Sequence, residues 1–138
     1  MESEKKSMGY LNLSSTLKNS KGSQTKPSWE DIEYLLKELK HLNGSVSLSV
    51  IDGKDIGVDS LEVRADKQHF LVTMLENTPD DDEEVRTLFF KNKQNLAQTQ
   101  ILGDYYDPTM ITDDLDLVIK IFKEFFENGN VSYDILSV

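Results

Sequence analysis

The chain has 138 residues, of which 38% are hydrophobic and 29% charged, so it can bury one core and is too apolar for a wholly disordered protein. Its formal charge of −10 disfavours direct binding to nucleic acid or to an anionic membrane and favours a basic partner. The lack of cysteine excludes disulfides and zinc-thiolate sites. Neither an export signal nor a membrane-spanning stretch is recognised, so we expect a cytoplasmic protein, with its oligomeric state left open.

The N-terminal stretch differs in composition from the rest of the chain. Residues 1–26 are rich in Ser, Lys, Asn and Gly and contain a short apolar island at Tyr10, Leu11 and Leu13. We predict a flexible polar arm for residues 1–26. Residues 27–138 are predicted to form a single α+β domain.

A first helix is predicted to begin near Trp29. Ser28 can cap it, and Asp31 stands three residues later, where the acid of a capping box belongs. Apolar residues then recur at helical spacing, at Ile32, Leu35, Leu36, Leu39 and Leu42. The pair Asn43-Gly44 is predicted to end the helix.

The middle of the chain has the composition of strands. In residues 45–50, "SVSLSV", valine and leucine alternate with serine, which is the period of a half-buried strand. Further candidates lie at residues 60–65, 69–76, 84–92 and 97–102. Because the connections are short, we predict an antiparallel meander of about five strands.

The strongest helical pattern follows Thr112, which is predicted to be the cap. Asp113 and Asp114 suit the first turn, and Asn128-Gly129 suits the end. Apolar residues cover more than half of its circumference, so this long C-terminal helix is expected to lie against the sheet. Residues 131–138 are predicted to be a short strand or a packed tail.

Few residues suit catalysis or metal binding. His41 is interpreted as structural because it stands at the end of the first helix, where a cation suits the helix dipole, and His69 because it has no second histidine at metal-ligand spacing. Residues 52–62, "DGKDIGVDSLE", do not match the calcium loop of an EF-hand, and no phosphate-binding glycine loop is present. We therefore predict no catalytic residue, no metal and no cofactor.

Acidic side chains gather in two groups. The first is the consecutive run Asp80, Asp81, Asp82, Glu83 and Glu84. The second places carboxylates beside Tyr105 and Tyr106, and its acids are Asp104, Asp107, Asp113, Asp114 and Asp116, with the stretch from Asp104 to Asp107 as its favoured part. Tyrosines among carboxylates are typical of protein interfaces, so both groups are candidate contacts for a partner, with the second favoured. The alternative is that both groups form solvated turns.

The C-terminal region resembles one group of bacterial immunity proteins, which belong to contact-dependent growth inhibition and related polymorphic toxin systems. The resemblance rests on "ILGD" (101–104), "ITDD" (111–114), "V..IFKEFFENG" (118–129) and "VS..IL" (131–136). The segment "PSWEDIEYLLKELKHLNG" followed by "SVSLSV" is similar to their N-terminal half, so roughly residues 27–138 are covered.

This resemblance implies an α+β domain without catalysis, which binds and blocks the toxic C-terminal domain of a cognate exported protein. Many such toxins are nucleases, often acting on transfer RNA, and a basic nuclease would be attracted by an acidic inhibitor. Two other classes stay open. One is a hydrolase that holds a divalent metal on its aspartates, and the other is an acidic regulatory adaptor or nucleic-acid mimic that binds a basic host protein.

Overall fold

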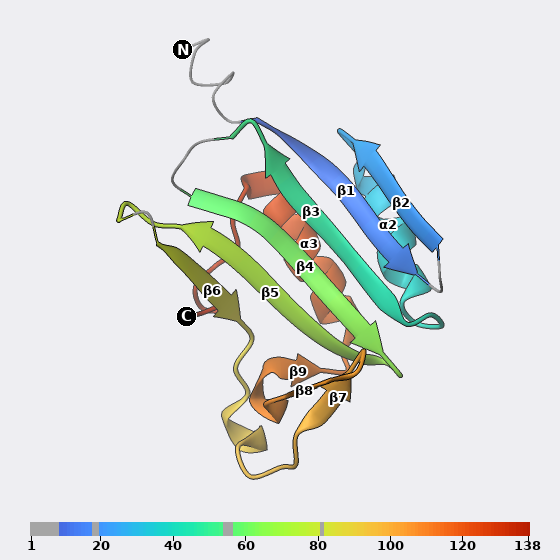
Figure 1. Cartoon of the computed structure of the whole chain (residues 1–138), viewed down its shortest axis with the longest axis vertical. Helices are drawn as coiled ribbons and strands as arrows, with labels where there is room; N and C mark the ends of the chain where they lie inside the picture. The colour runs from blue at the N-terminus through green and yellow to red at the C-terminus, as the bar shows by residue number, and fades with distance from the viewer. Residues whose placement is uncertain (1–8, 18–19, 54–56, 81) are drawn as a thin grey trace.

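The fold is an antiparallel sheet with two helices on one of its faces (Figure 1). The computed structural model describes residues 9–17, 20–53, 57–80 and 82–138. The main sheet has seven strands: six follow the order β2-β1-β3-β4-β5-β6, and β9 pairs with β5. The strands are β1 (Tyr10–Leu17), β2 (Ser20–Thr25), β3 (Gly44–Ile51), β4 (Gly57–Asp66), β5 (His69–Asn77), β6 (Glu83–Thr87) and β9 (Ile111–Thr112). The predicted α+β class is confirmed, with more strands than expected.

The prediction of a flexible N-terminal arm is wrong for the residues that form β1 and β2. β1 pairs with β3 along its whole length, from Tyr10 opposite Ile51 to Leu17 opposite Gly44. Its leucines follow a period of two, and Leu13 and Leu17 are buried in the core. Asn12, Ser14 and Thr16 alternate with the leucines and lie on the opposite face of the sheet, which explains why this segment has the composition of an arm. Residues 1–8 and 18–19 lie outside the described residues.

Helix α2 (Trp29–Glu38) begins as predicted. Ser28 accepts a hydrogen bond from the Asp31 N–H at 3.1 Å, and the Asp31 carboxylate accepts one from the Ser28 N–H at 3.0 Å. The helix ends at Leu39, before the predicted Asn43-Gly44 stop. Gly44 instead opens β3 with φ 148°, where a Cβ would collide with the backbone oxygen of Thr16. Gly44 therefore allows β1 and β3 to approach each other closely.

Helix α3 (Leu115–Asn128) starts at Asp114, which accepts a hydrogen bond from the Leu117 N–H at 3.2 Å. The predicted cap Thr112 lies in β9, where its hydroxyl accepts from the Asp114 N–H at 3.1 Å. Gly129 ends the helix at φ 73°, as predicted. The buried side of α3 packs on the same core as α2 and one face of the sheet, through Val118, Ile121, Phe122 and Phe125.

A small hairpin lies at one end of the sheet. It consists of β7 (Thr99–Ile101) and β8 (Asp104–Tyr106), which pair with each other and form a separate two-stranded sheet. Ile101 packs with Leu71 of β5 and Ile111 of β9 in a second core. The predicted strand at 97–102 thus belongs to the hairpin, and the one at 84–92 is shorter than expected, since residues 91–93 form a 3-10 turn. The hairpin covers one end of the opposite face, on which the described residues place no helix, and this face is called the helix-free face below.

Candidate functional site

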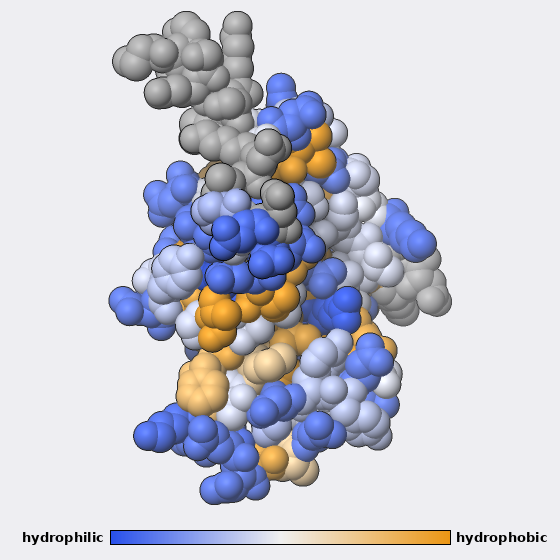
Figure 2. All heavy atoms as spheres, turned by 60° about the vertical axis from the view of Figure 1, so that its left-hand side comes forward, coloured by the Kyte–Doolittle hydropathy of each residue, from blue (hydrophilic) through white to orange (hydrophobic). Residues whose placement is uncertain are grey.

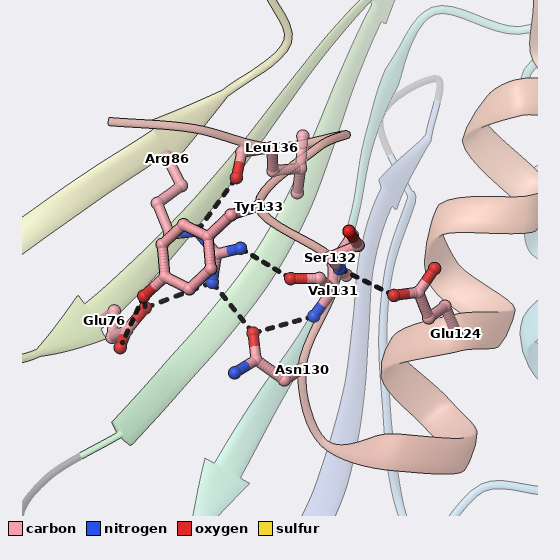
Figure 3. A network of polar contacts seen from close by, with 8 residues as sticks. All are labelled: Glu76, Arg86, Glu124, Asn130, Val131, Ser132, Tyr133 and Leu136. Atoms are coloured by element: carbon pink, nitrogen blue, oxygen red, sulfur yellow. Dashed lines mark hydrogen bonds and ion pairs between the residues drawn. The ribbon is translucent and has the colours of Figure 1, made fainter.

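Two clusters pair an arginine with a glutamate and a tyrosine, one on each face of the sheet. The buried cluster is centred on Arg86 of β6, whose side chain is fully buried (Figure 3). Its guanidinium donates to the Glu76 carboxylate at 3.1 Å and to the Asn130 amide oxygen at 2.8 Å. It also donates to the carbonyl oxygens of Leu136, at 3.1 Å, and Val131. Arg86 therefore ties β5 and β6 to the segment after α3.

Tyr133 closes this buried cluster from outside. The Arg86 Cζ lies 3.6 Å from the centre of the Tyr133 ring, and the phenol donates to Glu76 at 3.0 Å. The hydrogen bond to Glu76 raises the pKa of Tyr133 above its ordinary value. Among the described residues, every buried side-chain nitrogen and oxygen has a partner. The Arg86 cluster is thus fully engaged in holding the C-terminal segment, and we interpret it as structural.

The other cluster lies in a hollow on the helix-free face, with a volume of about 470 Å³. Serines and threonine from neighbouring strands form its floor, because their register places them on this face: Ser47, Ser49, Ser60 and Thr73. Aliphatic side chains form one side: Leu71, Leu75 and Val85. Tyr106 of the hairpin closes one end. A volume of this size is within the range of binding sites in proteins, about 300–1,000 Å³.

Arg64 is the central charged residue of the hollow. Its Nε donates to Glu62 at 3.2 Å, and its Nη1 donates to the Tyr106 hydroxyl at 2.9 Å. Partial burial alone would lower the pKa of Arg64, but Glu62 and Tyr106 outweigh it and raise the pKa, so the guanidinium stays charged. The Arg64 side chain remains 41% exposed. It is therefore held in position and still reachable by a partner.

The aliphatic side of the hollow is unusual for a solvated sheet face, which is normally polar. Val85 of the edge strand β6 lies opposite Leu75. It is 48% exposed, although valine is apolar. Phe89, just beyond β6, is 56% exposed. Figure 2, turned toward the β6 side, shows apolar side chains gathered across the middle of the molecule with polar groups above and below. This part of the helix-free face is therefore more hydrophobic than the usual solvated face of a sheet.

The favoured part of the predicted second group, Asp104 to Asp107, lies on the hairpin and directly after it, and its members point to different surroundings. The other acids of that group lie at the start of α3, with Asp114 as its N-cap and Asp116 in its first turn. Tyr106 lines the hollow, whereas Tyr105 is 65% exposed and Asp104 is exposed. The Asp107 carboxylate accepts hydrogen bonds from the Thr109 N–H at 3.0 Å and the Thr109 hydroxyl at 2.8 Å, which lower the pKa of Asp107. Asp107 thus caps the short 3-10 turn that follows.

The predicted acidic run lies at the other end of β5. Glu83 and Glu84 belong to β6, opposite Asn77 and Glu76, and the turn before them is far from the hairpin in Figure 1. Asn77 lies six positions along β5 from Leu71, which corresponds to about 20 Å. The two predicted groups therefore flank the hollow and do not form one cluster. Asp81 lies outside the described residues.

The described part of the chain brings no three metal-ligating side chains together. None of the helices in that part has the length and hydropathy of a membrane span. His41 is exposed in the turn after α2, and His69 is exposed at the start of β5. The residues that sequence reasoning missed are Arg64, Glu62 and the aliphatic side of the hollow. Only the alternation of residues 60–65 could have hinted at their shared face.

Comparison with known proteins assigns the chain to a protein family. The model of a family of unknown function matches residues 7–135. The chain belongs to the DUF6911 family. A crystal structure of a hypothetical protein from Neisseria gonorrhoeae is similar to this DUF6911 chain, with a TM-score of 0.78 over 92% of this chain and 93% of that one. At 18% identity the likeness shows the fold alone. No curated protein matches the sequence.

Proposed function

We propose that this protein is an immunity protein, which binds and neutralises the basic toxic C-terminal domain of a cognate bacterial protein in the cytoplasm. The observation that supports this function most is the hollow on the helix-free face. It combines aliphatic side chains, of which Val85 is 48% exposed, with an arginine and a tyrosine, and the last two residue types dominate the energetics of protein interfaces.

The chemistry of the hollow suits binding better than catalysis. Glu62, which could otherwise act as a base, is paired with Arg64 at 3.2 Å. The Tyr106 hydroxyl is likewise engaged with Arg64. These mutual contacts fix the side chains in one arrangement, which reduces the entropy lost when a partner docks.

Charge supports a basic partner. The chain carries a formal charge of −10, and acidic residues flank the hollow, with Glu83 on β6 and Asp104 on β8. A nuclease that grips an RNA backbone is usually basic, so the two fields would attract each other and speed association. An inhibitor of this charge would also compete with the negatively charged substrate.

Growth of bacteria tests this function. The C-terminal domain of an exported protein encoded next to this gene would be expressed with and without this chain. We expect the domain alone to stop growth and co-expression to restore it, with the two proteins purifying as a complex. If this chain neither restores growth nor binds that domain, the proposed function is wrong.

Salt dependence separates an immunity protein from an acidic adaptor or nucleic-acid mimic. A mimic should bind several unrelated basic proteins and lose affinity steeply between about 50 mM and 200 mM salt. A cognate immunity pair should discriminate between toxin domains and retain affinity through its packed anchors. Binding to unrelated basic proteins at the same affinity would favour the adaptor.

A further inference from the structure

We propose that the hollow receives one cationic amphipathic α-helix of the partner, which lies along β5 and gives the sheet a helix on both faces. This inference rests on the proposed function, because it names the part of the partner that the same site would hold. Helices already cover the opposite face of this antiparallel sheet, so a helix of the partner would add a third layer to a two-layer arrangement.

The backbone of the floor favours a helix over an extended segment. β4 pairs with β3 on one side and β5 on the other, and β5 pairs with β4, β6 and β9. Their backbone groups are used within the sheet, so an extended segment laid on this face would find no ladder to join. A helix satisfies its backbone hydrogen bonds internally and needs only side-chain contacts.

The dimensions and side chains of the hollow define the helix. From Asn77 to Thr73, before the hairpin packs on Leu71, β5 offers about 13 Å, which corresponds to a helix of about nine residues in contact with the sheet. The short side chains of Ser49 and Ser60 leave room for a close approach, while Leu75 and Val85 offer apolar surface. The helix therefore needs aliphatic or aromatic residues on the side that faces the sheet.

The charges around the hollow favour lysine or arginine on the flanks of this helix. Inside the hollow the positive charge of Arg64 is balanced by Glu62. Glu83 is exposed on the same face as Val85, two residues along β6, and Asp104 is exposed on the hairpin at the other end. Acidic groups thus stand at both ends of the path along β5.

Designed peptides test the inference without the toxin. One peptide of about 14 residues has leucine at helical spacing and lysine elsewhere, and a second has the same composition in strict alternation. We expect the helical pattern to bind about tenfold more tightly and to shift the methyl NMR signals of Leu71, Leu75 and Val85. Equal affinities, or shifts confined to other methyl groups, would overturn the proposal.

Matched variants separate the hollow from overall charge. Val85→Arg places a cation in the hollow, and Tyr34→Arg places the same charge on the exposed side of α2, where Tyr34 is 66% exposed. We expect only Val85→Arg to weaken the helical peptide, by about tenfold. Ser60→Trp, which fills the floor without a charge, should weaken it as well, with thermal melting used to check that each variant folds. Equal weakening by both arginine variants would mean that only charge matters.

The same variants tell failure of this inference from failure of the proposed function. If the toxin domain binds wild type and both Val85→Arg and Ser60→Trp with the same affinity, the function stands and the helix site is wrong. If the toxin domain does not bind wild type at all, the function is wrong, and the inference that rests on it is overturned too.

Discussion

Each face of the sheet carries a cluster of one arginine, one glutamate and one tyrosine, and the two clusters differ in burial. On the helix-covered side Arg86 is fully buried and joins Glu76 and Tyr133 to the C-terminal segment. On the helix-free side Arg64 is 41% exposed and joins Glu62 to Tyr106 of the hairpin. Both clusters connect the sheet to a segment distant in sequence.

The two arginines differ in the number of their hydrogen-bond partners and in their exposure to a partner protein. Arg86 bonds two carbonyl oxygens, an amide and a carboxylate, so its removal would leave several buried acceptors unpaired. Arg64 has two side-chain partners and faces an open hollow. The same residue type is thus expected to govern stability in one place and recognition in the other.

The largest expected effect is on stability at the buried cluster. Arg86→Ala should lower the free energy of unfolding by about 3–5 kcal/mol, because it leaves the Glu76 carboxylate and its neighbours without their donor. Urea unfolding monitored by circular dichroism measures the change. A loss below about 1 kcal/mol, as for an exposed ion pair, would remove the distinction between the two clusters.

The next effect is on binding at the exposed cluster. Arg64→Ala should weaken binding of the toxin domain by about 2 kcal/mol or more, as expected for an arginine at the centre of an interface. Its unfolding free energy should change by less than about 1 kcal/mol, because the pair with Glu62 is partly solvated. Calorimetric titration and urea unfolding of one preparation give both numbers. A stability loss equal to that of Arg86→Ala would contradict the comparison.

Tyr133 should give a smaller effect that depends on alkaline pH. Its folded pKa is raised by the hydrogen bond to Glu76, so the stabilisation is complete below the unfolded pKa of about 10 and is lost as pH rises through the folded pKa. Tyr133→Phe should cost at most about 1 kcal/mol at neutral pH, because half of the side chain is exposed, and should abolish this alkaline loss. Thermal melting across the alkaline range measures it, and an unchanged alkaline loss would argue against the bond.

The smallest expected effect concerns the capping acids. Hydrogen bonds from the Ser28 backbone and side chain lower the pKa of Asp31, and those from Thr109 lower the pKa of Asp107. Each contributes stability that is present above the ordinary pKa of about 4 and is lost as pH falls through the folded pKa. Asp31→Asn and Asp107→Asn should each reduce the acid sensitivity of the melting temperature slightly. Acid melting curves identical to wild type would contradict these roles.

Local signals allowed much of the fold to be predicted. The capping box at Ser28 and Asp31 marks the start of α2, and the Ser/Val/Leu alternation of residues 45–50 assigns the faces of β3 correctly, with Val46 and Leu48 buried. β1 and β2 were missed because their hydroxyl-rich side chains lie on the solvated face and resemble a linker. β1 pairs with β3, and the two strands are separated in the sequence by β2 and α2, so no local pattern reveals the pairing.

The candidate site could be predicted only in part. Tyr106 was expected at a partner surface and lines the hollow, but its companion Arg64 lies 42 residues earlier. In β6 the apolar residue Val85 is exposed and the charged residue Arg86 is buried, which is the reverse of what their hydropathy predicts. That inversion depends on acceptors from Glu76 and from the segment after α3, which no local pattern reveals.

The helix-free face is proposed to bind the partner. A calorimetric titration of the proposed toxin domain into wild type, Ser60→Trp and Tyr34→Ala tests this directly. Ser60→Trp fills the hollow, and Tyr34→Ala alters the exposed side of α2. We expect a loss of affinity of at least about tenfold for Ser60→Trp and none for Tyr34→Ala. Wild-type affinity in Ser60→Trp, or a loss confined to Tyr34→Ala, would contradict it.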